Sequence, residues 1–287
     1  MTEADAAQTV IVALEGGVSA GMTIRAREAG APIVLIAPAM GVEAAYYDKL
    51  ALALAEEGLN VAVADMRGLG TSSIRARRGV DFGYREIVEV DLPAIAAAAR
   101  GALGGGPLFL LGHSLGGQLG CLFASRAEPP LAGLILIACC SVYWRAWEPP
   151  LGAGIFAFQR VAEATSALMG YFPGHVFRFG GQEARRMTRD WASQGRTGAY
   201  RPEGSRVDYE AAMRQGRTPV LAISFTDDWY APEAAVRHLL DKMPAADRTH
   251  LHLSPWMLGT DKLGHFPWAR RPEAILPILT PWIDDRR

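Results

Sequence analysis

The sequence predicts an α/β fold in which a mostly parallel, doubly wound sheet carries an inserted, mainly helical cap. Short apolar runs rich in β-branched residues alternate with longer Ala-rich and Leu-rich segments, the pattern of strand–helix–strand units in a parallel sheet. This alternation stops at about residue 141 and resumes at about residue 217. The interruption holds 12 of the chain's 25 aromatic residues, whereas a linker should be poor in them, so we interpret it as a cap.

The predicted elements follow in a regular order. Apolar runs at 8–15 and 22–28, separated by Gly16 and Gly17, predict an antiparallel hairpin at the sheet edge. The later strands are expected at 31–38, 59–65, 107–112, 131–138, 218–225 and 248–254. The helices are expected at 44–58, 86–103, 115–127, 231–243 and 272–284, the last of them broken by Pro277. The core domain would therefore comprise 1–140 and 217–287, with the cap at 141–216.

Composition and charge exclude several classes of partner. With 50% hydrophobic and 21% charged residues, the chain has the composition of a soluble globular protein. A formal charge of -1 provides no field that would attract nucleic acid or an anionic membrane, so neither is expected as a partner. The chain lacks an apolar run of the length of a membrane span, and MTEADAAQTV lacks the apolar region of a secretion signal. The expected location is the cytoplasm, and the sequence does not decide whether the chain forms a homo-oligomer.

Neither a metal nor a cofactor is expected. Cys121, Cys139 and Cys140 lie in apolar surroundings without metal-ligand or redox spacing, so they should be reduced and buried. His250 and His252 would face the same side of a strand, which is a spacing that can hold a metal, but no Cys or carboxylate cluster accompanies them. No G-x-G-x-x-G follows the first strands, as a dinucleotide site would require.

The segment GHSLGG at 112–117 has the features of a nucleophile elbow. It follows a predicted strand and opens a predicted helix, which is the context that such an elbow requires. The turn would force Ser114 into a strained conformation that points its hydroxyl outward, and a Cβ at Gly112 or Gly116 would collide with neighbouring backbone. Ser114 is therefore the predicted nucleophile. Because a serine hydroxyl is weakly nucleophilic at neutral pH, it needs a base that a third group orients.

Two motifs together resemble the α/β-hydrolase superfamily. GHSLGG at the end of a parallel strand is similar to the elbow of these enzymes, and DMRGLGTSS at 65–73 resembles their D-x-R-G-x-G-x-S segment. The resemblance covers nearly the whole chain outside the cap and extends to bacterial serine hydrolases of the serine aminopeptidase-like and monoacylglycerol lipase-like branch. It implies an esterase-like or lipase-like serine hydrolase that needs no cofactor.

The resemblance also selects the acid and the base. In the superfamily the acid follows the strand after the cap, and VLAISFTDDWYAP resembles that strand, its Thr-Asp-Asp turn and the later Pro232. Asp228 is therefore the expected acid, although a one-residue shift of the turn would bring in Asp227 instead, so this alternative stays open. His265 lies in a Gly-flanked loop after the last predicted strand and completes the order Ser, Asp, His, which makes it the expected base.

A tetrahedral intermediate needs two backbone N–H donors for its oxyanion, and in this fold Leu115 supplies one of them. The resemblance places the second after the strand at 31–38, where these enzymes often have His-Gly before the donor. Pro38-Ala39 stand in that place here, so Met40 is the donor by position. Four aromatic residues are expected to contact the substrate: Tyr143, Trp144, Trp147 and Trp229.

These residues predict cleavage of a carboxylic ester or related acyl bond in a small, hydrophobic substrate. Ser114 would attack the carbonyl, His265 would take its proton, and Asp228 would fix the tautomer of His265. Because one fold hosts many chemistries, an acyltransferase, a thioesterase or a carbon–carbon hydrolase with the same triad remains the alternative. The alternative from another functional class is a protein that has this fold and binds a ligand without catalysis. The intact Ser, Asp and His argue against it.

Overall fold

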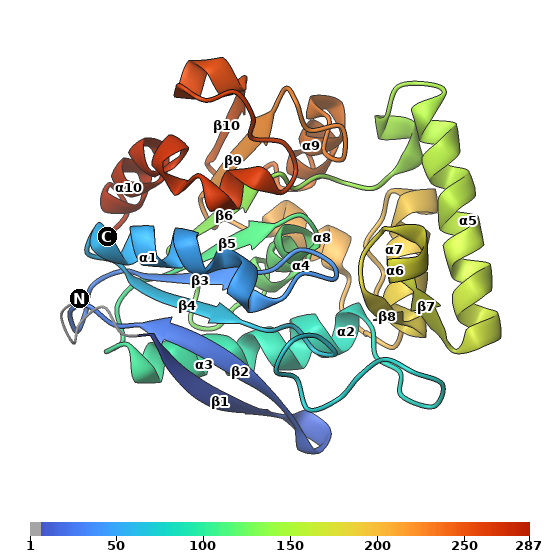
Figure 1. Cartoon of the computed structure of the whole chain (residues 1–287), viewed down its shortest axis with the longest axis horizontal. Coiled ribbons are helices and arrows are strands. Elements are labelled where there is room, and N and C mark those ends of the chain that lie inside the picture. The colour runs from blue at the N-terminus through green and yellow to red at the C-terminus, as the bar shows by residue number, and fades with distance from the viewer. Residues whose placement is uncertain (1–6) are drawn as a thin grey trace.

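The computed structural model describes residues 7–287, and its centre is an eight-stranded sheet (Figure 1). In spatial order, its strands are β1 (Gln8–Leu14), β2 (Val18–Arg25), β4 (Asn60–Ala64), β3 (Ile33–Ala37), β5 (Leu108–His113), β6 (Gly133–Ile137), β9 (Val220–Phe225) and β10 (Arg248–Leu253). β2 is antiparallel to both of its neighbours, and every pairing from β4 to β10 is parallel. The predicted mostly parallel α/β sheet and its edge hairpin are confirmed.

Helices cover both faces of this sheet. Along β3, Leu35 packs into the apolar cluster of one face and Ile36 into that of the other, which explains why the strand is apolar without alternation. One face is covered by α3 (Leu92–Ala102), α4 (Leu115–Ala124) and α9 (Glu233–Leu240). The other face is covered by α1 (Asp48–Glu56) and α10 (Leu276–Asp284).

Two predicted helices differ from the expectation at their ends. The helix expected from residue 86 begins as α2 (Tyr84–Glu86) and continues through a π-helical turn at Ile87–Asp91 into α3. At the C-terminus, Pro277 does not break a helix, because it lies in the first turn of α10, where the missing N–H of proline is not needed. The residues before it form a separate 3-10 turn, Pro272–Ala274.

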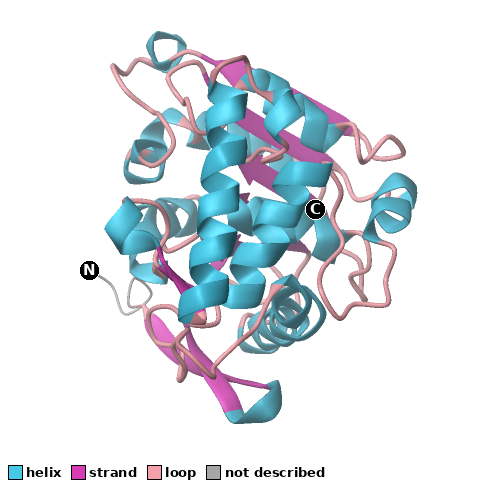
Figure 2. Ribbon diagram, turned by 90° about the vertical axis from the view of Figure 1, so that its right-hand side faces the viewer, coloured by secondary structure: helices cyan, strands magenta, loops and turns pink. Residues whose placement is uncertain are grey.

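The chain between β6 and β9 supplies a second layer of helices. It contains α5 (Leu151–Met169), β7 (Tyr171–Pro173), α6 (Gly174–Phe177), β8 (Gln182–Ala184), α7 (Arg185–Thr197) and α8 (Tyr209–Gln215). In Figure 1, α5, α6 and α7 stand beyond the end of the sheet toward which the parallel strands point, and Figure 2 views the molecule from that side. α5 packs along α7, whereas α8 packs against α4. Within residues 7–287, no helix has the length and apolarity to cross a membrane.

The DMRGLGTSS segment ties the sheet to its surroundings. The Asp65 carboxylate accepts hydrogen bonds from the backbone amides of Ala44 and Thr71, each at 2.8 Å. Gly70 has a φ of +47°, and a Cβ there would lie 2.2 Å from the Asp65 carboxylate, so both the conformation and the space require glycine. Arg67 donates two hydrogen bonds to Asp91, at 2.8 and 2.5 Å.

We expect Arg67→Met to destabilise the fold strongly. The side chains of Arg67 and Asp91 are only 7% and 2% exposed, so removing the guanidinium leaves a buried carboxylate without its counter-ion. The free energy of unfolding, measured by urea denaturation, should fall by about 3–5 kcal/mol. The double variant Arg67→Met/Asp91→Leu removes both charges and should recover most of this loss. A single variant as stable as the wild type would contradict the prediction.

Candidate active site

Ser114 lies at the sharp turn between β5 and α4. Its backbone has φ 52° and ψ −119°, a conformation that non-glycine residues rarely adopt. A Cβ at Gly112 would come within 2.3 Å of the Gly117 Cα, and one at Gly116 within 2.1 Å of the Ala37 oxygen. The glycines therefore allow the turn to pack tightly against the sheet, as the sequence predicted. This turn holds Ser114 at the carboxyl edge of the sheet, where it lines a cavity.

The structure brings Ser114, His265 and Asp228 together. The Ser114 Oγ lies 3.0 Å from Nε2 of His265, and Nδ1 of His265 lies 2.9 Å from Oδ2 of Asp228. The Asp228 carboxylate also accepts the amides of Tyr230 and Ala231, at 2.9 and 3.1 Å. Since a carboxylate only accepts, Nδ1 of His265 carries the hydrogen, and Nε2 is left to accept from the Ser114 hydroxyl.

Asp227 has a different partner. Its carboxylate accepts hydrogen bonds from the backbone amides of Leu263 and Gly264, both at 3.0 Å. These amides directly precede His265 in the chain. Of the two adjacent carboxylates, Asp228 therefore contacts the imidazole, whereas Asp227 holds the backbone of the loop that carries it.

Tyr47 joins the turn at Ser114 to the loop after β3, a link that the sequence analysis missed. Its hydroxyl accepts the Ala39 amide at 3.0 Å and lies 2.7 Å from Nδ1 of His113. Burial lowers the pKa of His113 well below its usual value, so the ring is neutral and shares a single hydrogen bond with the Tyr47 hydroxyl. Tyr47 stands in a 3-10 turn, Ala44–Tyr47, and no local pattern signals this contact across 66 positions.

The two predicted oxyanion donors border the same cavity. Met40 and Leu115 both line it together with Ser114. Within residues 7–287, neither backbone amide donates a hydrogen bond to another residue, whereas the neighbouring Ala39 amide is bound to Tyr47. Gly41 has a φ of +70°, and a Cβ there would lie 2.2 Å from the Gly181 nitrogen, so this loop packs closely against the chain between α6 and β8.

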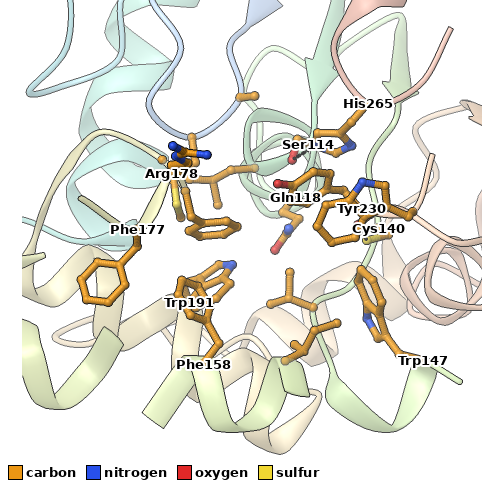
Figure 3. Close-up of a pocket in the computed structure, with 18 of the residues that line it drawn as sticks. Ser114, Gln118, Cys140, Trp147, Phe158, Phe177, Arg178, Trp191, Tyr230 and His265 are labelled. Carbon is orange, nitrogen blue, oxygen red and sulfur yellow. Dashed lines mark hydrogen bonds between the residues drawn. The ribbon is translucent and has the colours of Figure 1, made fainter. Parts of the chain in front are cut away.

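The cavity beside Ser114 measures about 340 Å³ and is largely apolar (Figure 3). The chain between β6 and β9 supplies much of its wall, including Trp147, Ile155, Phe158, Phe179 and Trp191. Polar side chains are few, and Gln118 and Arg178 are two of them. A cavity of this size and lining is typical of a site for a small, mostly apolar molecule.

The aromatic residues expected at the substrate divide into two pairs. Trp147 and Trp229 line the cavity, with Trp147 buried and Trp229 60% exposed. Tyr143 and Trp144 do not line it, which corrects the prediction for these two. The ring of Tyr143 packs against His238, with 5.0 Å between ring centroids, and Trp144 packs against Phe156 at 5.4 Å.

Comparison with known proteins assigns the family. The model of the family described as "Serine aminopeptidase, S33" matches residues 29–190, more than half of the chain. The chain belongs to this family of α/β-hydrolases. It is therefore a hydrolase, and the resemblance inferred from its two motifs is confirmed. No curated protein sequence gives a significant match to the chain.

Solved structures share the fold of this S33-family chain at low sequence identity. A soluble variant of monoglyceride lipase from Saccharomyces cerevisiae, in complex with a substrate analogue, is 16% identical, with a TM-score of 0.72 over 98% of this chain and 97% of that chain. A thermophilic esterase from Thermogutta terrifontis is 19% identical, with a TM-score of 0.62 over 97% and 98%. A thioesterase domain from the curacin biosynthetic pathway is 17% identical, with a TM-score of 0.60 over 96% and 99%.

The three cysteines of the S33-family chain and the two histidines of β10 lie outside the triad. Cys121, Cys139 and Cys140 are free and buried, as predicted, and burial raises the pKa of the Cys140 thiol well above its usual value. His250 and His252 both contact the Ser224 hydroxyl, at 2.9 and 2.8 Å. Within the described part of the chain, no group of three or more His, Cys, Asp or Glu side chains could hold a metal ion.

Proposed function

We propose that this chain is a serine hydrolase that cleaves a carboxylic ester or related acyl bond of a small, hydrophobic substrate through an acyl-enzyme. The observation that carries the proposal is a line of hydrogen bonds from Asp228 through His265 to Ser114, with 2.9 Å and 3.0 Å between the bonded atoms. This line ends at an apolar cavity of about 340 Å³. A nucleophile, a base and an orienting carboxylate thus meet where an acyl group could bind.

In the proposed mechanism, Ser114 Oγ attacks the substrate carbonyl while its proton passes to Nε2 of His265. Asp228 stabilises the imidazolium that forms, and the amides of Met40 and Leu115 donate to the oxyanion. His265 then returns the proton to the leaving oxygen, and the carbon–oxygen bond breaks to give the acyl-enzyme. A water molecule repeats the same steps, so that the carboxylic acid leaves and Ser114 regains its proton.

The proposal assigns residues 141–216 as a cap on a core of 1–140 and 217–287. Support comes from α5, α7 and the chain between α6 and β8, which line the cavity. α8 packs against α4 instead, so the part of the cap that would contact the substrate ends before it. Residues 1–6 of the predicted core lie outside the described residues.

The lining of the cavity supports an ester substrate with an apolar acyl group. Phe158 and Trp191 offer the substrate flat apolar surfaces, and no Asp or Glu is among the residues that line the cavity within 7–287. Two solved structures with this fold are described as a monoglyceride lipase and an esterase, and both names denote ester hydrolysis. We therefore place ester hydrolysis before acyl transfer, thioester hydrolysis and carbon–carbon cleavage.

The proposal is tested with p-nitrophenyl esters from acetate to laurate. We expect an optimum at short to medium acyl chains, because the cavity, at about 340 Å³, is near the lower end of ligand pockets. Added alcohols report on acyl transfer in the same assay. If transfer of the acyl group to the alcohol exceeds hydrolysis by water, the proposed hydrolase is wrong. A protein that cleaves no ester but still reacts with a fluorophosphonate at Ser114 would contradict the substrate class while leaving the nucleophile in place.

A further inference from the structure

A buried amide faces the cavity one helical turn beyond Ser114. Gln118 is the fourth residue after Ser114, lies on α4 and lines the cavity, yet it is only 3% exposed. Ser114 is the N-cap of α4 and Gln118 lies in the first turn of the helix, and both side chains line the same cavity. In Figure 3 the Gln118 side chain lies between Ser114 and Trp191.

Tyr200 determines which end of this amide faces the cavity. Its hydroxyl donates to Oε1 of Gln118 at 3.1 Å, and Tyr200 is itself 1% exposed. Burial raises the pKa of Tyr200 well above its usual value, so the hydroxyl keeps its proton and remains a donor. If the amide were reversed, the hydroxyl hydrogen of Tyr200 would have no acceptor among residues 7–287. The orientation with Oε1 toward Tyr200 therefore satisfies the hydrogen bond of this hydroxyl.

The NH₂ group of Gln118 is therefore a fixed donor with no partner. Across residues 7–287, no atom accepts a hydrogen bond from Gln118 Nε2. The nearby wall of the cavity is apolar and includes Ile155, Phe158 and Trp191. A plain alkyl chain bound there would displace water from Nε2 without replacing its hydrogen bond, which is unfavourable for a buried polar group.

We propose that the natural substrate is an ester whose acyl chain carries an oxygen acceptor, a ketone carbonyl or a hydroxyl, which accepts a hydrogen bond from Gln118 Nε2. Gln118 is then a specificity-determining residue, and Tyr200 is a positioning residue that acts through it. This inference rests on the proposed ester hydrolase and narrows its substrate class from alkyl esters to oxygenated acyl esters.

The test compares p-nitrophenyl hexanoate with its 3-oxo, 4-oxo and 5-oxo derivatives. A ketone oxygen accepts but cannot donate, so it is matched to Nε2 and not to a reversed amide. At the position that reaches Gln118, the wild type should prefer the oxo ester in kcat/KM by about 10- to 100-fold, after correction for the hydroxide-catalysed rates of the two esters. Gln118→Leu should remove this preference. Gln215→Leu, an exposed glutamine on α8, is the matched control and should keep it.

Tyr200→Phe supplies a second variant if Gln118→Leu does not fold. It removes the hydroxyl that orients the amide and should reduce the preference, which a loss of stability alone would not do. If the wild type cleaves the hexanoate and prefers no oxo derivative, the inference is wrong and the proposed hydrolase stands.

If no ester is cleaved, the proposed function fails, and binding decides the inference. Binding of ethyl hexanoate and its oxo derivatives to Ser114→Ala is then followed by tryptophan fluorescence, since Trp147 and Trp191 line the cavity. Tighter binding of one oxo ester that is lost in Ser114→Ala/Gln118→Leu supports the inference. Equal binding of all the esters overturns it.

Discussion

Ser114→Ala is expected to lower kcat for ester hydrolysis by about 10⁴–10⁶-fold. The loss should be this large because the covalent route through an acyl-enzyme requires the hydroxyl that lies 3.0 Å from Nε2 of His265. The removed group is a single oxygen, and alanine keeps the Cβ of serine, so the backbone conformation at residue 114 should be unchanged. Initial rates on the preferred p-nitrophenyl ester give kcat, and thermal unfolding checks that the variant is folded.

Ser125→Ala is the matched control for this prediction. Ser125 lies at the end of α4, and its hydroxyl donates to the Leu122 carbonyl, so it contacts the helix and not the cavity. Its variant should hydrolyse the ester as the wild type does and should still react with a fluorophosphonate. Substantial hydrolysis by folded Ser114→Ala, or fluorophosphonate labelling of that variant, would show that another residue is the nucleophile.

Asp228→Asn is expected to lower kcat/KM by about 10³–10⁴-fold, whereas Asp227→Asn should cost less than about tenfold. The Asp228 carboxylate accepts from Nδ1 of His265 and has a side chain with no exposed surface. An asparagine NH₂ in its place can donate to Nδ1, which would put the hydrogen on Nε2 and remove the acceptor that Ser114 needs. The charge that stabilises the imidazolium would also be lost.

The paired variant Asp227→Asn separates catalysis from support of the loop. Asp227 accepts two backbone amides, and an asparagine oxygen can still accept one of them, so the loop should hold His265 nearly in place. We expect a stability loss of about 1–2 kcal/mol in urea denaturation with a modest change in kcat/KM. If Asp227→Asn is the more inactive of the two, the acid has been assigned to the wrong residue.

Much of the fold and part of the site could be predicted because the signals are local. Continuous apolar runs mark strands that are buried on both faces, and β3 packs against both apolar clusters as such a run requires. The elbow at Ser114 depends on glycines within three residues of it, whose missing Cβ atoms allow the turn. These features need no knowledge of distant segments.

Contacts between distant segments could not be predicted in the same way. Which of Asp227 and Asp228 faces the imidazole depends on the course of a loop 37 residues further along the chain. Tyr47 reaches His113 across 66 positions, and Tyr200 reaches Gln118 across 82. Aromatic composition likewise indicated that the chain between β6 and β9 is packed, but not which rings line the cavity.

The sequence by itself therefore determined the sheet and the elbow at Ser114, because local backbone geometry and burial constrain these residues where they stand. The order of Ser, Asp and His rested instead on the resemblance to the α/β-hydrolases. Only the tertiary structure decided the partner of His265, the support of the Ala39 amide by Tyr47, and the free NH₂ group of Gln118 in the cavity. Each of these depends on where a second segment lies, and side-chain hydrogen bonds form only within about 3 Å. Spacing along a chain does not specify such a distance until the core has packed.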